Sequence, residues 1–245
     1  MTRPVRGDTE ARASGFDAKM EAGFAWVAEH LRMVLIVLGV LLLAGVSVAI
    51  SYEIRTSSEN EAQLALALVE AGFARAMGSS VSDALVVEPA NEAQATRGRE
   101  EALGRFEAVV LDHRGTRAAQ LAQLRAAEME VDLARWRDAE ARLGQLAGGL
   151  SGDDILRAMA LRLMGFALEQ QGRFEEAGES YVRAGAVERY PVRGGLFIAA
   201  GASFARAGAV ERAIAAFQRA VSLDPELAER EGVVDRLGEL SALSG

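Results

Sequence analysis

The sequence predicts an all-α protein, in which one long apolar helix is followed by an array of stacked helix pairs. Three observations support this fold class. Half of the 245 residues are hydrophobic and only 4 are proline, a composition that favours helices. Residues 33–50 form an apolar run that carries no charge. Residues 158–227 then repeat one pattern of glycine, alanine and aromatic residues.

Residues 1–30 are expected to form a tail and a juxtamembrane segment. Residues 1–15 have little apolar content, which is typical of a segment without a packed core. Apolar residues then recur at helical spacing, at Phe16, Met20, Phe24, Val27 and Leu31. Two interpretations stay open: a helical lead-in to the next element, or a helix that lies in the membrane interface.

Residues 31–52 are predicted to be a transmembrane helix. As a helix, residues 33–50 would be about 27 Å long, close to the ~30 Å of a hydrocarbon core. A buried core helix is the first alternative, but such helices seldom run this long without a charge. A cleavable signal peptide is the second, because Ser47, Val48 and Ala49 offer small residues. However, about 30 residues precede the run, which is long for a charged leader region. We therefore expect an uncleaved single-pass anchor.

The basic residues predict the orientation of this anchor. Five of them precede the span: Arg3, Arg6, Arg12, Lys19 and Arg32. Arg55 is the one basic residue among the twenty that follow it. By the positive-inside rule the N-terminus lies in the cytoplasm, and residues 53–245 lie across the membrane.

The repeated pattern is centred on Gly172 and Gly208, which are 36 residues apart. Each glycine suits the left-handed residue that ends a helix. Gly165 and Gly201 stand seven residues earlier, where the absence of a side chain lets a paired helix approach closely. Three positions of the second helix also recur in both units: Ala177 and Ala213, Tyr181 and Phe217, Ala184 and Ala220. The two aromatic residues are expected to fill the space between stacked repeats.

This pattern resembles the tetratricopeptide repeat (TPR), a helix–turn–helix unit of about 34 residues. The clearest repeats are residues 158–191 and 194–227. Residues 120–146 resemble a third, with Ala127 in place of the glycine and Trp136, Ala139 and Leu143 in the second helix. Residues 59–111 resemble a degenerate first repeat, interrupted by an insertion at 78–96.

The chain is expected to close with one capping helix over residues 226–243. Asp224 and Pro225 are a cap and a first helical residue. The last unit of a solenoid needs a helix with one apolar face, and residues at helical spacing supply it: Leu227, Val234, Leu237 and Leu240. The predicted fold is therefore an N-terminal transmembrane helix, a tetratricopeptide-repeat α-solenoid and a C-terminal capping helix.

No catalytic or metal-binding site is expected in this chain. It has no cysteine and two histidines, His30 and His113, neither of which has a motif partner. Phosphate loops, metalloprotease helices and nucleophile elbows are absent from the sequence. The net charge of −8 disfavours non-specific binding of nucleic acid. We expect no enzyme activity, no metal, no cofactor and no small-molecule substrate.

The resemblance implies a protein-binding groove, because the first helix of each TPR unit lines the concave face. The register places eleven residues there: Leu124, Glu128, Val131, Asp132, Arg162, Phe166, Glu169, Gln170, Ile198, Ala202 and Arg206. Phe166 is a large apolar side chain that either contacts a bound peptide or packs between helices. The Lys and Asn clamp that some relatives use to hold C-terminal carboxylates is not present.

The layout of tail, span and repeats also resembles the ancillary subunit of the bacterial Sec translocon. This resemblance implies the bacterial cytoplasmic (inner) membrane, a periplasmic repeat domain, and partners such as the translocon, periplasmic chaperones or a membrane-bound prolyl isomerase. The expected function is a membrane-anchored scaffold for protein–protein interaction. The alternative is a structural assembly or oligomerisation component of an envelope complex without a client groove. An open groove with Phe166 exposed favours the scaffold, and a groove blocked by the helix of residues 59–77 favours the alternative.

Overall fold

The computed structural model describes residue 26 and residues 30–78 and 91–243, and all of its regular elements there are helices. The chain divides into two compact units, residues 1–57 and 58–245. Helix α2 (Leu31–Ala76) contributes to both. Of the predicted tail and juxtamembrane segment, all but Trp26 and His30 lies outside the described residues. Among the described residues, no helix combines the length and the apolar character that a membrane crossing needs.

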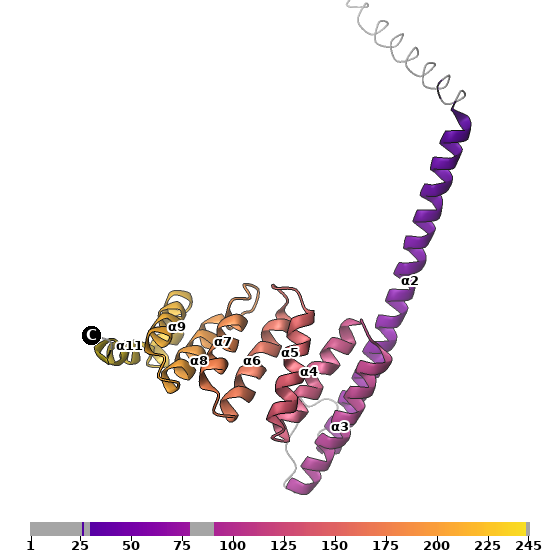
Figure 1. Cartoon of the computed structure of the whole chain (residues 1–245). Coiled ribbons are helices and arrows are strands. Elements are labelled where there is room, and N and C mark those ends of the chain that lie inside the picture. The colour runs from indigo at the N-terminus through magenta and orange to yellow at the C-terminus, as the bar shows by residue number, and fades with distance from the viewer. Residues whose placement is uncertain (1–25, 27–29, 79–90, 244–245) are drawn as a thin grey trace, which may run out of the picture. The chain divides into compact units, whose positions relative to one another are not determined.

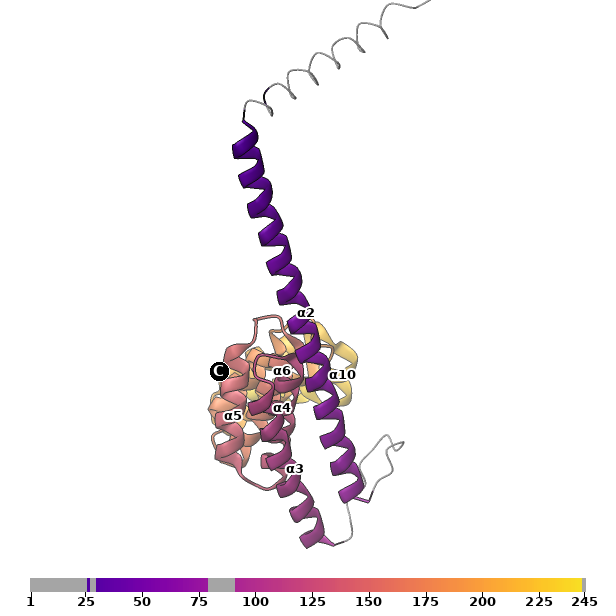
Figure 2. The ribbon, with the colours of Figure 1, turned by 90° about the vertical axis from the view of Figure 1, so that its right-hand side faces the viewer.

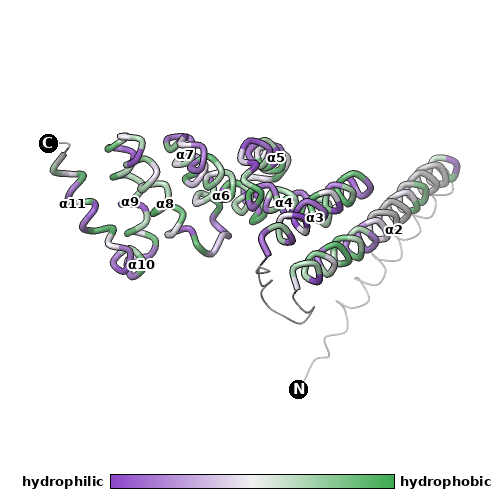
Figure 3. The backbone as a smooth tube through the Cα atoms, turned by 90° about the horizontal axis from the view of Figure 1, so that it is seen from below, coloured by the Kyte–Doolittle hydropathy of each residue, from purple (hydrophilic) through white to green (hydrophobic). Residues whose placement is uncertain are grey.

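The second unit stacks helices in chain order, as Figure 1 shows. After α2 come α3 (Glu92–Asp112), α4 (Arg117–Asp132), α5 (Trp136–Gly149), α6 (Ile155–Gln170), α7 (Phe174–Gly185), α8 (Arg193–Arg206), α9 (Val210–Leu223), α10 (Pro225–Arg230) and α11 (Val233–Leu243). Figure 2 looks along this stack. Along α3 to α9, hydrophobic and hydrophilic residues alternate, as expected for helices buried on one side (Figure 3).

The same turn joins the helices of three successive pairs. Its central residue has a positive φ each time: Gly172 at 75°, Gly208 at 76° and Ala134 at 55°. The N–H of the following residue donates to a carbonyl five residues back in all three turns: Arg135 to Glu130 (2.8 Å), Arg173 to Leu168 (3.0 Å) and Ala209 to Phe204 (2.9 Å). This is the Schellman arrangement that ends a helix at a left-handed residue. The prediction for Gly172 and Gly208 is confirmed, and the third repeat places an alanine in the same strained position.

Close packing within each clear pair depends on its first-helix glycine. A Cβ atom on Gly165 would lie 2.7 Å from the ring of Tyr181, and one on Gly201 would lie 2.6 Å from the ring of Phe217. Each ring therefore lies on the glycine of its own helix pair. Two further close approaches lie at the α7–α8 junction, where Phe204 packs on Gly178 and Phe197 packs on Gly185.

The first pair is formed by residues 58–76 of α2 and by α3, and its insertion is shorter than predicted. Asn91 caps α3, since its side-chain oxygen accepts hydrogen bonds from the N–H groups of Ala93 (3.1 Å) and Gln94 (3.3 Å). Residues 92–96 are therefore helical, which corrects the expected loop of 78–96. Ala102 and Phe106 are buried where the second helix of a repeat carries alanine and an aromatic residue.

Two expectations about helix ends are wrong. Helix α7 ends at Gly185, whereas the repeat was expected to stay helical to Pro191. Pro191 and Val192 instead lead directly into α8. The C-terminal cap consists of two helices, because the chain turns at Gly232 with φ 64°.

The face of the C-terminal cap also differs from the prediction. Val233 is fully buried, while Val234 is 58% exposed, so Val234 does not belong to the apolar face. The predicted start is confirmed: the Asp224 carboxylate accepts a hydrogen bond from Leu227 N–H (3.0 Å), and Pro225 is the first helical residue.

Ion pairs spaced by about one repeat connect the second helices of successive pairs. Arg142 of α5 pairs with Glu107 of α3 (2.6 Å), and Arg173 of α7 pairs with Glu140 of α5 (2.6 Å). Arg212 of α9 continues the series with Glu175 (2.8 Å) and Glu179 (3.0 Å) of α7. These pairs link α3, α5, α7 and α9 as one layer, with α3 in the place of a second repeat helix.

Candidate protein-binding pocket

First helices of successive pairs build an open apolar pocket of about 470 Å³. Its lining is Val131 from α4, Arg162, Leu163 and Phe166 from α6, Tyr181 from α7, and Val192, Gly195, Leu196 and Ala199 at and after the start of α8. Seven of these nine residues are aliphatic, aromatic or glycine without a polar side-chain group; Arg162 and Tyr181 carry the polar ones. We call this the Phe166 pocket.

Phe166 is supported from one side and open on the other. Its ring meets the Trp136 ring edge-to-face, with centroids 6.1 Å apart and an interplanar angle of 77°. The side chain is nevertheless 39% exposed. None of the described residues of α2 lines the pocket. Of the two sequence interpretations, packing accounts for the contact with Trp136, and the remaining exposure leaves a surface that a ligand could cover.

Three of the predicted groove residues meet in the pocket: Val131, Arg162 and Phe166. Arg162 is exposed, and among the described residues its guanidinium has no ion pair or hydrogen bond. It lies close enough to Tyr181 to influence the pKa of the phenol. One unpaired cation therefore stands at an apolar cavity.

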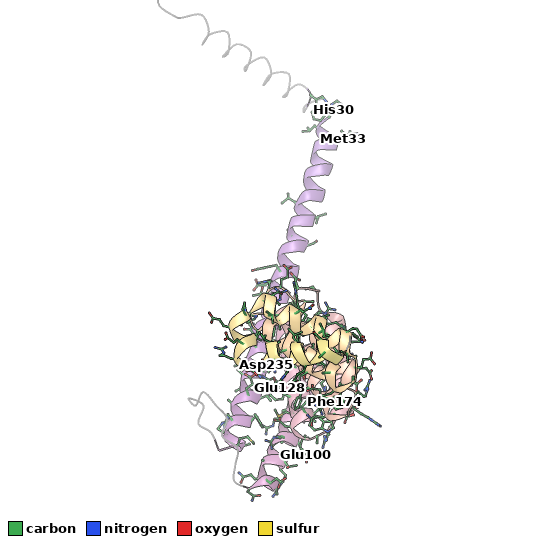
Figure 4. All side chains as sticks on the ribbon, turned by 90° about the vertical axis from the view of Figure 1, so that its left-hand side faces the viewer. His30, Met33, Glu100, Glu128, Phe174 and Asp235 are labelled. Carbon is green, nitrogen blue, oxygen red and sulfur yellow. The ribbon has the colours of Figure 1, made fainter. Side chains whose placement is uncertain are left out.

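Three predicted residues on α4 lie outside the pocket. Leu124 is 3% exposed and belongs to the core, which corrects its assignment to the groove surface. Glu128 pairs with Arg125 (2.9 Å), and Asp132 pairs with Arg99 (3.5 Å). Figure 4 labels Glu128 among the side chains of the stack.

The remaining predicted residues on α8 and at the end of α6 are also outside the pocket. The Arg206 guanidinium lies over the Phe174 ring, 3.8 Å from its centroid, in a cation–π contact. Gln170 is exposed, and Ile198 and Ala202 are half-buried against the core. As binding residues, all of the predicted set stays a prediction.

Glu169 joins helices in this structure. Its carboxylate accepts hydrogen bonds from the Tyr181 hydroxyl (3.1 Å) and from the Ser203 hydroxyl (2.5 Å), and Ser203 is fully buried. Burial, and then the neighbouring Glu169 charge, raise the pKa of the Tyr181 phenol well above its ordinary value. Glu169 thus connects α6, α7 and α8, and its hydrogen bond fixes the hydroxyl of Tyr181, which lines the Phe166 pocket.

Sequence reasoning missed most of the α8 side of the pocket. A glycine pair such as Gly194 and Gly195 would usually indicate the end of a helix, but both lie in the first turn of α8. A Cβ on Gly194 would lie 2.9 Å from Cβ of Asp224, so this glycine permits a close approach. The sequence signal for this side of the pocket was an apolar residue, Val192, placed directly after Pro191. In the structure its side chain is 54% exposed.

Two smaller cavities lie between the end of α2 and the start of α3. Their volumes are about 240 and 350 Å³, and they share Ala76, Gly98 and Glu101. In the part of the chain that the structure describes, no group of three or more His, Asp or Glu side chains could hold a metal ion. His30 stacks on Trp26, with ring centroids 4.8 Å apart.

Comparisons with known proteins give partial similarity to solved structures. No family model matches the chain, and no curated protein matches it. Two solved structures from Podosopora anserina, assigned as a kinesin light chain with nearly identical TPR-like repeats, resemble it with TM-scores of 0.46 and 0.45. Both are 14% identical to this chain in sequence. The matched region covers 60% of this chain and 89% of each solved structure.

Proposed function

From the stack of TPR-like helix pairs, we propose that this protein is a membrane-anchored scaffold that binds a protein partner through the Phe166 pocket. The observation that carries the proposal is the open apolar cavity at α4, α6 and α8, with Phe166 39% exposed inside it. Apolar pockets with a few placed polar groups are the usual form of a binding site. A TPR-like fold typically supplies such surfaces and is non-catalytic.

The lining defines the chemistry of the partner segment. A volume of about 470 Å³ accommodates a large apolar side chain, and its burial against Phe166 and Leu196 would drive binding. The unpaired guanidinium of Arg162 favours a carboxylate beside that side chain. The proposed ligand is therefore a protein segment with one bulky apolar residue next to an acidic residue.

Quantitative co-purification tests the pocket. The full-length chain is purified with its bound proteins, and these are compared by mass spectrometry for the wild type, Phe166→Glu and the control Gln218→Glu. Gln218 is exposed on α9 outside the pocket. We expect Phe166→Glu to lose a discrete partner and the control to keep it, because an added carboxylate opposes apolar burial. Equal recovery from all three chains would overturn the pocket assignment.

The proposal places residues 31–52 across the bacterial cytoplasmic membrane as a single-pass anchor, with the repeats in the periplasm. The supports are the uncharged run of 33–50 and the excess of basic residues before it. In that setting the Sec translocon and periplasmic chaperones are the candidate partners.

Protease treatment of spheroplasts tests the anchor and its orientation separately from the pocket. Digestion of the repeats from outside, together with a full-length mass for the untreated chain, is the expected result. Protection of the repeats would place them in the cytoplasm. A chain that begins near Ile50 would show that the apolar run is a cleaved signal peptide.

A further inference from the structure

Helix α4 is covered on two opposite faces by its neighbours in the stack. One face packs with α2 and α3 through four residues: Ala118, Ala122, Ala126 and Met129. The opposite face packs in the core of α5 and the later helices through Leu124, Ala127 and Val131. As an internal first helix, α4 therefore buries one face on the preceding pair and the other on the following pair.

Helix α2 is covered on one of these faces in the second unit. Ala62 and Leu66 are buried in the cluster that it shares with α3 and α4. At 100° per residue, the opposite side of the helix carries Leu64, Ala67, Leu68 and Ala71. Leu64 is 63% exposed and Leu68 is 61% exposed. We call these four residues the α2 stripe; it stands where a preceding helix pair would pack.

The two ends of the stack differ in chemistry. The last helix, α11, exposes Asp235, Arg236 and Glu239, as expected for the polar outer face of a terminal unit. The four residues of the α2 stripe carry no charge. Contiguous apolar faces of this kind mark interaction sites.

The spacing of the stripe selects its occupant. Leu64, Leu68 and Ala71 follow the alternating three- and four-residue steps of a coiled-coil seam, and the charged residues Glu61 and Arg75 stand at the two ends of this apolar stretch. An apolar stretch with this spacing on one helix fits a second helix of the same kind lying parallel to it. An uncharged stripe can meet its own copy without burying an unpaired charge.

We infer that the α2 stripe is the interface of a parallel homodimer, in which Leu64 and Leu68 of one protomer pack on the same residues of its partner. This surface is distinct from the Phe166 pocket, so either assignment can fail without the other. A parallel pair also lets both copies enter one membrane from the same side.

Single cysteines test the geometry, because the natural chain contains no cysteine. Leu64→Cys, Ala71→Cys and the control Gln63→Cys are made in the full chain and treated with a short bifunctional maleimide in cell extract that includes membranes. Gln63 is also exposed but lies about 100° from Leu64 around the helix. Self-cross-linking at both 64 and 71 and its loss at 63 is the expected result, since an antiparallel pair cannot align both positions with themselves.

A second variant guards against chance encounters in the membrane. Leu64→Glu with Leu68→Glu adds charges at exposed positions, so the thermal unfolding of the repeats should stay unchanged while the sedimenting mass in detergent halves. A wild-type chain that sediments as a monomer, or cross-linking at 63 equal to that at 64 and 71, would overturn the homodimer. Cross-linking at 64 or 71 to a different protein alone would assign the stripe to another partner and overturn it as well.

Discussion

At the residue scale, packing in this protein is set by pairs of residues that compensate each other in size. Gly165 faces Tyr181 and Gly201 faces Phe217, with no room for a methyl group between them. At the corresponding positions of the third repeat, Ala127 and Leu143 are both fully buried. An alanine is tolerated there because leucine is smaller than an aromatic ring. The sequence reveals these pairs, since both members recur with the repeat.

Gly165→Ala should therefore destabilise the protein and be rescued by its partner. The added Cβ would lie 2.7 Å from the Tyr181 ring, an overlap that typically costs ~1–3 kcal/mol. Combining it with Tyr181→Leu gives the same residue pair as Ala127 and Leu143. The double variant should therefore lose less free energy of unfolding than the two single variants lose together. Urea unfolding measures the four free energies of this cycle. Strict additivity would contradict the compensation.

Ala134→Gly should stabilise the protein by ~1 kcal/mol, because an L-residue with a side chain pays about this much in the left-handed region. Ala134 has φ 55° in a turn that is otherwise built on glycine. Gly172→Ala, at the same place in the next pair, is the matched control and should lose a similar amount. Thermal melts of the two variants check the opposite signs. A destabilised Ala134→Gly would show that this alanine has another role.

At the element scale, helix starts are tied together by side chains from other helices. Arg117 N–H and Ala118 N–H, at the start of α4, donate to the Glu59 carboxylate of α2 at 2.7 and 3.0 Å. The Arg117 guanidinium in turn donates two hydrogen bonds of 2.8 Å to Asp154, which caps α6. Thr116 caps α4, since its hydroxyl accepts a hydrogen bond from Ala119 N–H (3.1 Å). Local caps can be recognised from sequence, whereas these distant partners depend on how the repeats stack.

Asp154→Asn should remove a pH-dependent part of the stability. The hydrogen bonds from Arg117 hold the pKa of the Asp154 carboxyl below its ordinary value. Its stabilisation is therefore present above the unfolded pKa of about 4 and is lost as the pH falls below it. We expect the variant to be less stable than the wild type by ~1 kcal/mol at neutral pH, and this difference should narrow as the pH falls below about 4. Asp235→Asn, on the exposed face of α11, is the control. A stability gap that does not narrow in acid would contradict the assignment.

At the scale of the whole molecule, the sequence predicts the repeats well and the binding surface poorly. Gly172, Gly208 and the Asp224–Pro225 cap lie where the periodic pattern places them. The insertion and α7 were predicted to be longer than they are. The insertion ends at an asparagine cap and α7 ends at a glycine under an aromatic ring, and both features are weak signals in a sequence. Val131, Arg162 and Phe166 were placed at one surface, but Leu124 is buried and the α8 wall was missed. Pocket walls depend on the loop geometry between repeats, which periodicity does not specify.

The layers of the stack are also held by a buried ion pair. Arg142 of α5 donates to both oxygens of Glu130 in α4 at 2.9 and 2.6 Å, and Glu130 is 3% exposed. Its hydrogen bonds with Glu130 raise the pKa of Arg142 further above its ordinary value. Arg142→Ala would leave a buried charge without its partner and should cost ~3–5 kcal/mol. The exposed pair of Arg105 and Glu101 supplies the control, since Arg105→Ala should cost less than ~1 kcal/mol. Similar losses for both variants in urea unfolding would contradict this difference.

Site-specific photo-cross-linking in living cells tests the central claim most directly. A photoreactive phenylalanine analogue at position 166 preserves the aromatic contact with Trp136 and reports what enters the pocket. The same analogue at Arg137, exposed on α5 outside the pocket, is the control. The account predicts one or a few discrete protein adducts at 166 that are absent at 137 and that disappear when Arg162→Glu is added. Identical adduct patterns at 166 and 137, or no adduct at 166, would contradict a protein-binding pocket.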